Sequence, residues 1–209
     1  MNQENAIIAD LYYLPPIEYF VGILDFEEIV IDQMEMFQKQ TYRNRAQILL
    51  TNKVDMLSVP VIGSKKQLYK DVKIDYSQKW KNIHLRGIQS AYGKAPFFEY
   101  FYPYFEQVYG KNLTFLFDMN TELLTVCLKL LRLNTKLNLL ADRAATPEAV
   151  NIRGKIHSKN EFVQRDIMTP QVYPQMFGLD FVPNLSVIDL LFCMGPESKE
   201  ILIQSKINH

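Results

Sequence analysis

Residues 5–32, which read NAIIADLYYLPPIEYFVGILDFEEIVID, decide the fold. A short apolar run near the start of this stretch predicts a strand over about Asn5 to Leu11. Pro15-Pro16 predicts the start of a helix, because proline fits the first turn, where its missing N–H is not needed. The β-branched residues Ile29-Val30-Ile31, followed by Asp32, predict a second strand. A strand, a short helix and a strand in succession predict a βαβ unit.

Further elements follow from the same reasoning. The polar residues 52–55, between Arg45–Thr51 and Met56–Ile62, predict a β-hairpin. Residues Gln78–Tyr92 carry apolar side chains at helical spacing and predict a helix. That helix is predicted to have its N-cap at Ser77 and its end at Gly93. Strands are predicted at Val72–Ile74 and Lys136–Leu140. Three more helices are predicted: one from Pro96 that Pro103 kinks or divides, one from Asn120 to about Leu133, and one that starts with a capping box at Ser186 and Asp189 and ends at Gly195-Pro196.

The length and composition are those of one α/β domain. With 209 residues, of which 48% are hydrophobic, the chain can bury a sizeable core. We therefore expect a single domain over residues 1–209, with a mixed β-sheet flanked by helices. Residues 141–169 form a long segment with clustered charges and little periodicity. Loops of that length are usually functional or mobile, so we expect either a lid over a site or a disordered insertion there.

Membrane-spanning, exported and disulfide-rich classes do not fit this sequence. The most apolar segment, Leu123–Leu133, contains Lys129 and Arg132, whereas a membrane span needs about 20 nearly uncharged residues. The first residues lack the basic start and the long apolar core of a signal peptide. The two cysteines, Cys127 and Cys193, are too few for a disulfide framework and lie in apolar segments. We expect a cytoplasmic protein with both thiols reduced and buried.

A formal net charge of zero hides an uneven distribution of charge along the chain. Residues 1–38 hold eight acidic residues and no lysine or arginine, whereas residues 39–94 hold twelve basic and three acidic residues. The basic central segment predicts an anionic small-molecule ligand. The alternative is that the acidic and basic segments face each other within the fold. A nucleic-acid partner is not expected, because the chain is not basic overall and contains no recognised binding motif.

Several motifs in a fixed order resemble one known family. They are Tyr13-Leu14-Pro15, Lys39-Gln40-Thr41-Tyr42-Arg43-Asn44-Arg45, Val59-Pro60-Val61, the segment from Trp80 to His84 and the segment from Asn184 to Phe192. In order and spacing, over residues 10–196, they resemble the WbqC-like protein family. The resemblance implies a soluble bacterial protein, in some members encoded with O-antigen genes. It also implies a role as an aminoacyl (glycine) transferase on an amino sugar, within surface-polysaccharide synthesis.

The chain also departs from the family pattern. Residues 10–16 lack the glutamine, the first proline and the tryptophan that many members carry there, which puts contacts by those side chains in doubt. In the long charged segment, Arg153, His157 and Lys159 match a family motif. Further matches are Tyr173, Gln175 and Phe177, which fit a Tyr-x-Gln-x-Phe pattern.

Basic side chains in these motifs are the main candidates for ligand binding. A guanidinium binds phosphate or carboxylate through two hydrogen bonds, whereas a lysine supplies a point charge. In an unbroken strand Lys39 and Arg45 would lie about 20 Å apart. They would then hold opposite ends of a nucleotide-sugar, unless the chain turns between them; the alternative is that they are solvated surface residues. The candidate substrate-binding or phosphate-binding residues are Lys39, Asn44, Arg45, Arg153, Lys159 and Tyr13.

Two histidines are the candidate catalytic residues. His84 lies four residues after Trp80, on or beside a buried helical stripe, and is either a hydrogen-bonded core residue or a general base. His157 lies between Arg153 and Lys159. If the long charged segment folds over a ligand, His157 can act as general base on an amine nucleophile while the two cations hold an anion.

Motifs for metals and cofactors are absent from the sequence. No HxxxH or CxxC spacing occurs, and the eight scattered glycines form no phosphate-binding loop. We therefore predict no metal site and no resident cofactor, and expect ATP or a nucleotide-sugar only as a substrate.

The sequence leaves three functions open. The first is an acyl or aminoacyl transferase acting on a nucleotide-linked amino sugar, and the second is a non-catalytic binding or assembly protein of the same pathway. The third is an ATP-dependent amino-acid-activating enzyme, since the βαβ start resembles that of HIGH-motif nucleotidylyltransferases, in which a helix N-terminus holds phosphates. The positions of five side chains distinguish an enzyme from a binding protein: an enzyme would bring them together in one cleft, and a binding protein would leave them dispersed. They are Lys39, Arg45, His84, Arg153 and His157. The oligomeric state is not indicated.

Overall fold

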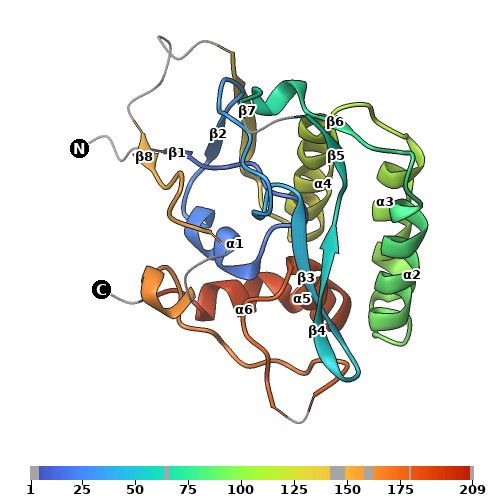
Figure 1. The fold of residues 1–209 in the computed structure, drawn as a ribbon. Helices are drawn as coiled ribbons and strands as arrows, with labels where there is room; N and C mark the ends of the chain where they lie inside the picture. The colour runs from blue at the N-terminus through green and yellow to red at the C-terminus, as the bar shows by residue number, and fades with distance from the viewer. Residues whose placement is uncertain (1–4, 64–65, 142–148, 158–161, 179, 208–209) are drawn as a thin grey trace.

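The βαβ unit predicted from residues 5–32 is present in the computed structural model, which describes residues 5–63, 66–141, 149–157, 162–178 and 180–207 (Figure 1). It consists of β1 (Ala6–Ile8), α1 (Ile17–Ile23) and β2 (Glu28–Asp32). The two strands are parallel, with Ile7 opposite Ile29. Both of these side chains are fully buried, as the apolar runs of the sequence require.

The largest sheet has four strands in the order β7-β2-β1-β8, and every neighbouring pair is parallel. The outer strands are β7 (Lys136–Leu140), beside β2, and β8 (Val150–Asn151), beside β1. The chain therefore runs from β1 outward to β2 and β7, and then returns to the other side of β1 as β8. Strand β1 is the point at which the strand order reverses, and the carboxyl ends of all four strands lie at one edge.

Antiparallel pairing occurs in two separate two-stranded sheets. One is the hairpin of β3 (Arg45–Leu50) and β4 (Lys53–Ser58), and the other pairs β5 (Val61–Ile62) with β6 (Lys73–Ile74). The predicted strand over residues 56–62 is wrong in its bounds, because Pro60 cannot donate to a ladder and separates β4 from β5. The turn is also tighter than residues 52–55, since Leu50 pairs directly with Lys53.

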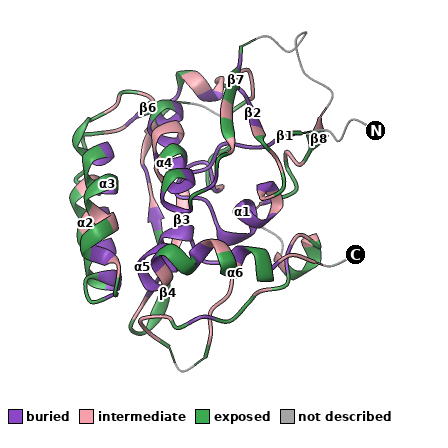
Figure 2. Cartoon of the chain, turned by 180° about the vertical axis from the view of Figure 1, so that it is seen from behind, coloured by how far each residue is buried: buried purple, intermediate pink, exposed green. Residues whose placement is uncertain are grey.

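Five further α-helices of the described part of the chain surround these sheets, and the predicted α/β class with helices flanking a sheet is confirmed (Figure 1). They are α2 (Trp80–Tyr92), α3 (Phe98–Gly110), α4 (Leu116–Leu130), α5 (Val187–Met194) and α6 (Ser198–Gln204). Short 3-10 turns lie between β5 and β6 (η1, Tyr69–Asp71), between β8 and α5 (η3, Phe162–Arg165), and between α5 and α6 (η4, Gly195–Glu197). Helix α5 contacts each of the other five helices and is buried almost throughout (Figure 2). Among the described residues, no helix has the length and apolar character that crossing a membrane requires.

Two predicted helix starts, at Asn120 and at Ser77, are wrong, because the polar side chains concerned have other partners. Asn120 lies inside α4 and donates to the backbone oxygen of Arg43 at 2.7 Å. Ser77 bonds to Asp75 instead of capping α2. The predicted helix start at Ser186 is confirmed, because Ser186 is the N-cap of α5, but its hydroxyl donates to the Leu14 backbone oxygen, so the predicted capping box does not form.

Helix α3 is not divided at Pro103, which lies inside it. The segment predicted over residues 141–169 contains two short elements, β8 and η3. Residues 142–148 and 158–161 lie outside the described residues, and so do the lid and the disordered insertion predicted for them.

Candidate functional site

A cavity of about 650 Å³ lies at the carboxyl edge of the parallel sheet. Its walls come from the segments that follow three adjacent strands: Asp10 and Tyr12 after β1, Glu35 after β2, and Arg153 after β8. Ligands of open α/β sheets bind at this edge, in the crevice where the strand order reverses. The full lining is Asp10, Tyr12, Glu35, Met36, Gln38, Thr41, Arg43, Asn151, Arg153, Gly154, Ile156 and His157.

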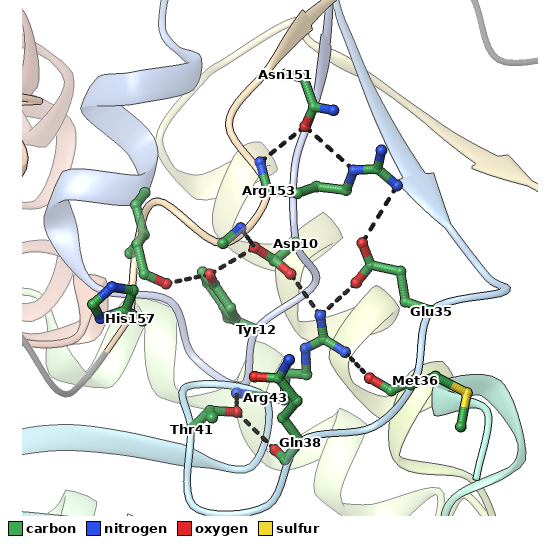
Figure 3. Close-up of a pocket in the computed structure, with 12 residues that line it drawn as sticks. Asp10, Tyr12, Glu35, Met36, Gln38, Thr41, Arg43, Asn151, Arg153 and His157 are labelled. Carbon is green, nitrogen blue, oxygen red and sulfur yellow. Dashed lines mark hydrogen bonds and ion pairs between the residues drawn. The ribbon is translucent and has the colours of Figure 1, made fainter. Parts of the chain in front are cut away.

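Local turns direct these segments into the pocket. After β8, the Asn151 side-chain oxygen accepts from the backbone N–H of Arg153 at 3.1 Å and from its Nε at 3.2 Å (Figure 3). Gly154 then adopts a φ of 71°, which glycine tolerates without strain, and its N–H donates to Asp10 Oδ2 at 2.7 Å. After β2, Asp32 Oδ1 accepts from the N–H of Met34 at 2.8 Å and turns the chain toward Glu35.

Two arginines and three carboxylates form one ion network in the pocket. Arg43 donates from Nη2 to Asp10 at 2.6 Å and to Glu35, and from Nη1 to the Met36 backbone oxygen at 2.7 Å. Arg153 Nη1 lies 3.0 Å from Asp32 and 3.5 Å from Glu35. Glu35 therefore bridges the two guanidinium groups (Figure 3).

The pKa values of two members of the network, Glu35 and Arg43, are shifted. Burial raises the pKa of Glu35; Arg43 and Arg153 oppose this shift, while Asp10 and Asp32 add to it. Burial alone would lower the pKa of Arg43, but Asp10 and Glu35 outweigh it and keep the guanidinium charged. Glu35 is thus a carboxyl group whose pKa has moved toward neutrality, as proton transfer requires.

Tyr12 closes the inner wall as a neutral donor. Burial, together with the negative charge of Asp10, raises the pKa of the Tyr12 phenol far above its ordinary value. Its hydroxyl lies 3.0 Å from Asp10 Oδ2 and also contacts the backbone oxygen of Ile156. Asp10 consequently accepts from Tyr12, Arg43 and the Gly154 N–H, and is held rigidly.

The predicted catalytic histidines do not share a site. His157 lines the pocket, whereas His84 lies on α2, in a separate cavity beside β4. His84 Nδ1 is 2.8 Å from the hydroxyl of Tyr13, and that hydroxyl also contacts Tyr109. Burial lowers the pKa of His84 to about 4, and this buried, hydrogen-bonded setting is the core-histidine alternative that the sequence allowed.

Only part of the predicted set of binding residues converges. Arg153 lines the pocket, but Tyr13, Lys39, Asn44 and Arg45 do not. Lys39 is exposed, Arg45 is half-buried on β3, and Asn44 is a buried structural residue that donates to the backbone oxygen of Val59 at 3.0 Å. The Asn44 side chain also accepts from the Gln40 N–H, so the chain turns between Lys39 and Arg45. Lys159 lies outside the described residues.

Sequence reasoning missed the residues that dominate the pocket. They are Asp10, Glu35 and Arg43, which line it, and Asp32, which pairs with Arg153 but does not itself line the pocket. A signal was present for two of them, because Asp10 and Asp32 follow β-rich runs, where the carboxyl ends of parallel strands meet. Arg43 stands inside the motif that contributed Lys39, Asn44 and Arg45 as candidates.

Comparison with known proteins gives a family for this chain. A profile of the WbqC-like protein family matches residues 11–159 and 156–201. The chain belongs to that family. This WbqC-like protein is also similar to the uncharacterised protein Rv1507c of Mycobacterium tuberculosis, with 25% identity over 230 residues that cover 95% of this chain and 97% of that protein. No solved structure matches it significantly.

Metal and thiol chemistry have no support in the described part of this WbqC-like protein. Within those residues, no group of three or more histidine, cysteine, aspartate or glutamate side chains is placed to hold a metal ion. Both cysteines are buried and free. Burial raises the pKa of Cys127 well above its ordinary value and that of Cys193 to about 12, so neither thiol is activated as a nucleophile.

Proposed function

We propose that this WbqC-like protein is an acyl or aminoacyl transferase whose pocket binds a nucleotide-linked amino sugar and acylates its amine. The observation that carries the proposal is the ion network at the strand-order reversal, in which Glu35 lies between Arg43 and Arg153. The family resemblance supports the amino-sugar pathway, and the carboxylates and guanidinium groups of the pocket support the chemistry.

The charges of the pocket fit a ligand that carries both an amine and an anionic group. Asp10 and Glu35, which line the pocket, are partners for an ammonium group and for sugar hydroxyls, because carboxylates accept hydrogen bonds from both. Arg153, whose side chain is 29% exposed, is better placed than Arg43, at 8%, to exchange a protein partner for a phosphate. A ligand that is only anionic fits less well, since the carboxylates would repel it.

Acyl transfer to an amine needs a base, and Glu35 is the best-placed candidate. The amine nitrogen must lose a proton as it attacks the carbonyl carbon of an activated acyl donor, such as a thioester or an acyl phosphate. A carboxylate with a raised pKa accepts that proton more readily than an ordinary one. The new C–N bond forms while the bond from the carbonyl carbon to the leaving group breaks, and the leaving group departs with the electron pair. His157, on the same pocket, is the second candidate base.

The ATP-dependent alternative is less well supported. In that reading the N-terminus of α1 would hold phosphates, but two of its N–H groups already have protein partners. Ile17 donates to the backbone oxygen of Leu185 and Glu18 to the side chain of Asn184, each at 3.0 Å. Glu18 also adds a negative charge in the first turn of the helix.

Calorimetry tests the binding step. The ligands are a uridine-diphosphate sugar with a free amine, the same sugar N-acetylated, the same sugar without the amine, and uridine diphosphate alone. We expect the free-amine sugar to bind most tightly, and Glu35→Gln to weaken it by about tenfold through loss of one charge-assisted hydrogen bond. Glu122→Gln is the matched control, because Glu122 pairs with Lys111 in a partly exposed ion pair away from the pocket.

Mass spectrometry tests the transfer step with a set of acyl and aminoacyl thioesters as donors. Acylated sugar is the expected product for the wild-type protein and for Glu122→Gln, with none for Glu35→Gln. Failure of every sugar to bind at millimolar concentration would overturn the proposal. Tight binding without product from any donor would instead support the non-catalytic binding protein.

A further inference from the structure

A buried ion pair lies directly behind the pocket wall that carries His157. Glu18, on α1, is fully buried, and the side chain of Arg165, at the end of η3, is 6% exposed. Arg165 Nε donates to Glu18 Oε2 at 2.8 Å and Nη2 donates to Oε1 at 2.6 Å. This two-bond geometry is specific to arginine, because lysine cannot present two parallel N–H groups.

The side chain of Glu18 is itself held by a residue of a third segment, the turn before α5. The Asn184 side chain donates to Glu18 Oε1 at 2.9 Å and accepts from the Glu18 backbone N–H at 3.0 Å. Burial raises the pKa of Glu18, while Asn184 and Arg165 oppose that shift. The carboxylate is therefore a rigid anchor for the arginine, held by partners distant in the chain.

The third nitrogen of Arg165 connects this anchor to the pocket. Nη1 donates to the backbone oxygen of His157, which lines the pocket. Arg165 also hydrogen-bonds to Tyr42, whose ring centroid lies 5.7 Å from that of the pocket residue Tyr12. Arg165 itself does not line the pocket.

The His157 end of the wall depends on this contact. Residues 152–154 are attached through the Ile152 N–H on Ile8, the Arg153 side chain on Asp32 and Glu35, and the Gly154 N–H on Asp10. Closer to His157, the Ile156 oxygen contacts the pocket residue Tyr12, and the His157 oxygen accepts from Arg165, which comes from outside the pocket. The buried ring Nδ1 of His157 finds no hydrogen-bond partner in the described part of the chain. The contact from Arg165 to the backbone oxygen therefore holds the chain at the residue that carries the imidazole.

We propose that Arg165 is a positioning residue, which Glu18 holds in place so that it fixes His157 at the pocket wall in the geometry that ligand binding requires. The inference rests on the proposed function in that it takes the pocket to be the ligand site. Arg165 acts through His157 and does not touch the ligand. It follows that the charge-preserving Arg165→Lys variant displaces the imidazole. Lysine keeps the positive charge beside Glu18 but lacks the separate N–H groups with which arginine binds Glu18 and the His157 backbone oxygen together.

NMR of the imidazole nitrogens tests the inference without any ligand. The chain has three histidines, so the signals of His157 are assigned with His157→Gln. We expect Arg165→Lys to shift and broaden the His157 signals, while the His84 signals stay in place. Asp189→Asn is the control for loss of stability alone, because Asp189 is a buried carboxyl on α5 whose partners are Tyr173 and Gln175.

Calorimetry with the free-amine sugar nucleotide is the second readout. Loss of hydrogen bonds to charged groups predicts that Arg165→Lys weakens binding by about tenfold to a hundredfold, and that Asp189→Asn leaves it unchanged. Should Arg165→Lys fold poorly, the double variant Glu18→Gln/Arg165→Met removes the pair without leaving a buried charge, and the same shifts of His157 are expected.

The outcomes separate the two proposals. Unchanged His157 signals in Arg165→Lys overturn the positioning role, whatever the ligand does. Shifted signals with unchanged affinity also overturn it, because the placement of His157 then has no effect on binding. If the wild-type protein binds no sugar of the panel, the proposed function fails, and the NMR result alone decides whether Arg165 places His157.

Discussion

At the scale of single residues, His84 links stability to pH. It is buried against Tyr13 and Trp80, and burial lowers its pKa to about 4, so the neutral imidazole is the form that fits the core. The unfolded chain protonates near the ordinary value of about 6.5. The contribution of the neutral His84 to stability is therefore complete above about pH 6.5 and is lost as the pH falls to about 4. The free energy of unfolding then falls by roughly 3 kcal/mol in total.

Urea unfolding over this range of pH measures the effect. We expect His84→Gln to remove the loss, because glutamine can still accept from the Tyr13 hydroxyl and has no proton to gain. Between about pH 4 and pH 6.5, the free energy of unfolding of the wild-type protein should fall more steeply with falling pH than that of the variant. The difference in slope should correspond to one more proton bound by the unfolded wild-type chain. Identical slopes in the two proteins would show that His84 is not the titrating group.

Arg43 is the residue whose loss we expect to cost most in the pocket. It neutralises Asp10 and Glu35 and lies over the ring of Tyr69, 5.2 Å from its centroid. Arg43→Met leaves both carboxylates short of a partner, so the free energy of unfolding should fall by about 3–5 kcal/mol, the usual cost of breaking a buried pair from one side.

An exposed ion pair provides the control for Arg43. Lys53 and Asp55 are 2.9 Å apart on the solvent-facing hairpin, and Lys53→Met should change stability by less than about 1 kcal/mol, as exposed pairs do. Urea unfolding of both variants at neutral pH checks the contrast. An equal, small effect of the two substitutions would mean that the pocket network does not stabilise the fold.

The residues of the site were only partly predictable because charge by segment does not show which charges are buried. The basic central segment contains both Arg43 and Arg45, two residues apart. Arg43 precedes β3 and turns into the pocket, whereas Arg45 starts the strand and pairs with Ser58. That choice depends on where the strand begins, which the sequence fixes only to within a few residues.

At the scale of elements, the end of α5 depends on one glycine. Gly195 has a φ of 53°, and an added Cβ would lie 2.4 Å from the ring of Phe97. We expect Gly195→Ala to lower the free energy of unfolding by roughly 2–5 kcal/mol, since a left-handed backbone costs other residues about 1–2 kcal/mol and overpacking about 1–3 kcal/mol.

Gly110 is the matched control for Gly195. It ends α3, and nothing lies within 4 Å of the position that a Cβ would take. Gly110→Ala should leave stability unchanged or raise it by up to about 1 kcal/mol, because alanine loses less backbone freedom than glycine. Thermal unfolding of the two variants decides; a similar loss in both would contradict the close contact with Phe97.

Elements with a strong period were predictable, and those defined by distant partners were not. The strand at Lys136–Leu140 matches β7, and the helix predicted over Gln78–Tyr92 matches α2 from Trp80 onward, although Ile83 of its apolar stripe is exposed. The caps failed because serine and asparagine side chains bond equally well to distant backbone, as Asn120 does to Arg43. The strand β8 has two residues and no periodicity, so only its pairing with β1 defines it.

At the scale of the whole molecule, ion pairs connect regions that the sequence separates. The acidic residues of 1–38 do face the basic segment, because Arg43 forms ion pairs with Asp10 and Glu35. They also pair with Arg153 and Arg165, which come from the last third of the chain. The predicted contact between acidic and basic segments therefore involves three parts of the chain: residues 1–38, the basic central segment and the last third. The pocket forms only when all three are folded together.

This assembly predicts that residues 1–141 alone do not fold cooperatively. Without the rest of the chain, β1 loses its neighbour β8, and the core loses α5, whose first seven residues are buried. The N-terminus of α1 also loses the acceptor that Leu185 provides. We expect the fragment to show a broad, non-cooperative urea transition by circular dichroism, and co-expression with residues 149–209 to restore a single transition together with the His157 imidazole signals. A sharp transition of the isolated fragment at the midpoint of the full chain would mean that the sheet and its pocket edge are stabilised locally, without the closing segment that β8, Arg165 and α5 provide.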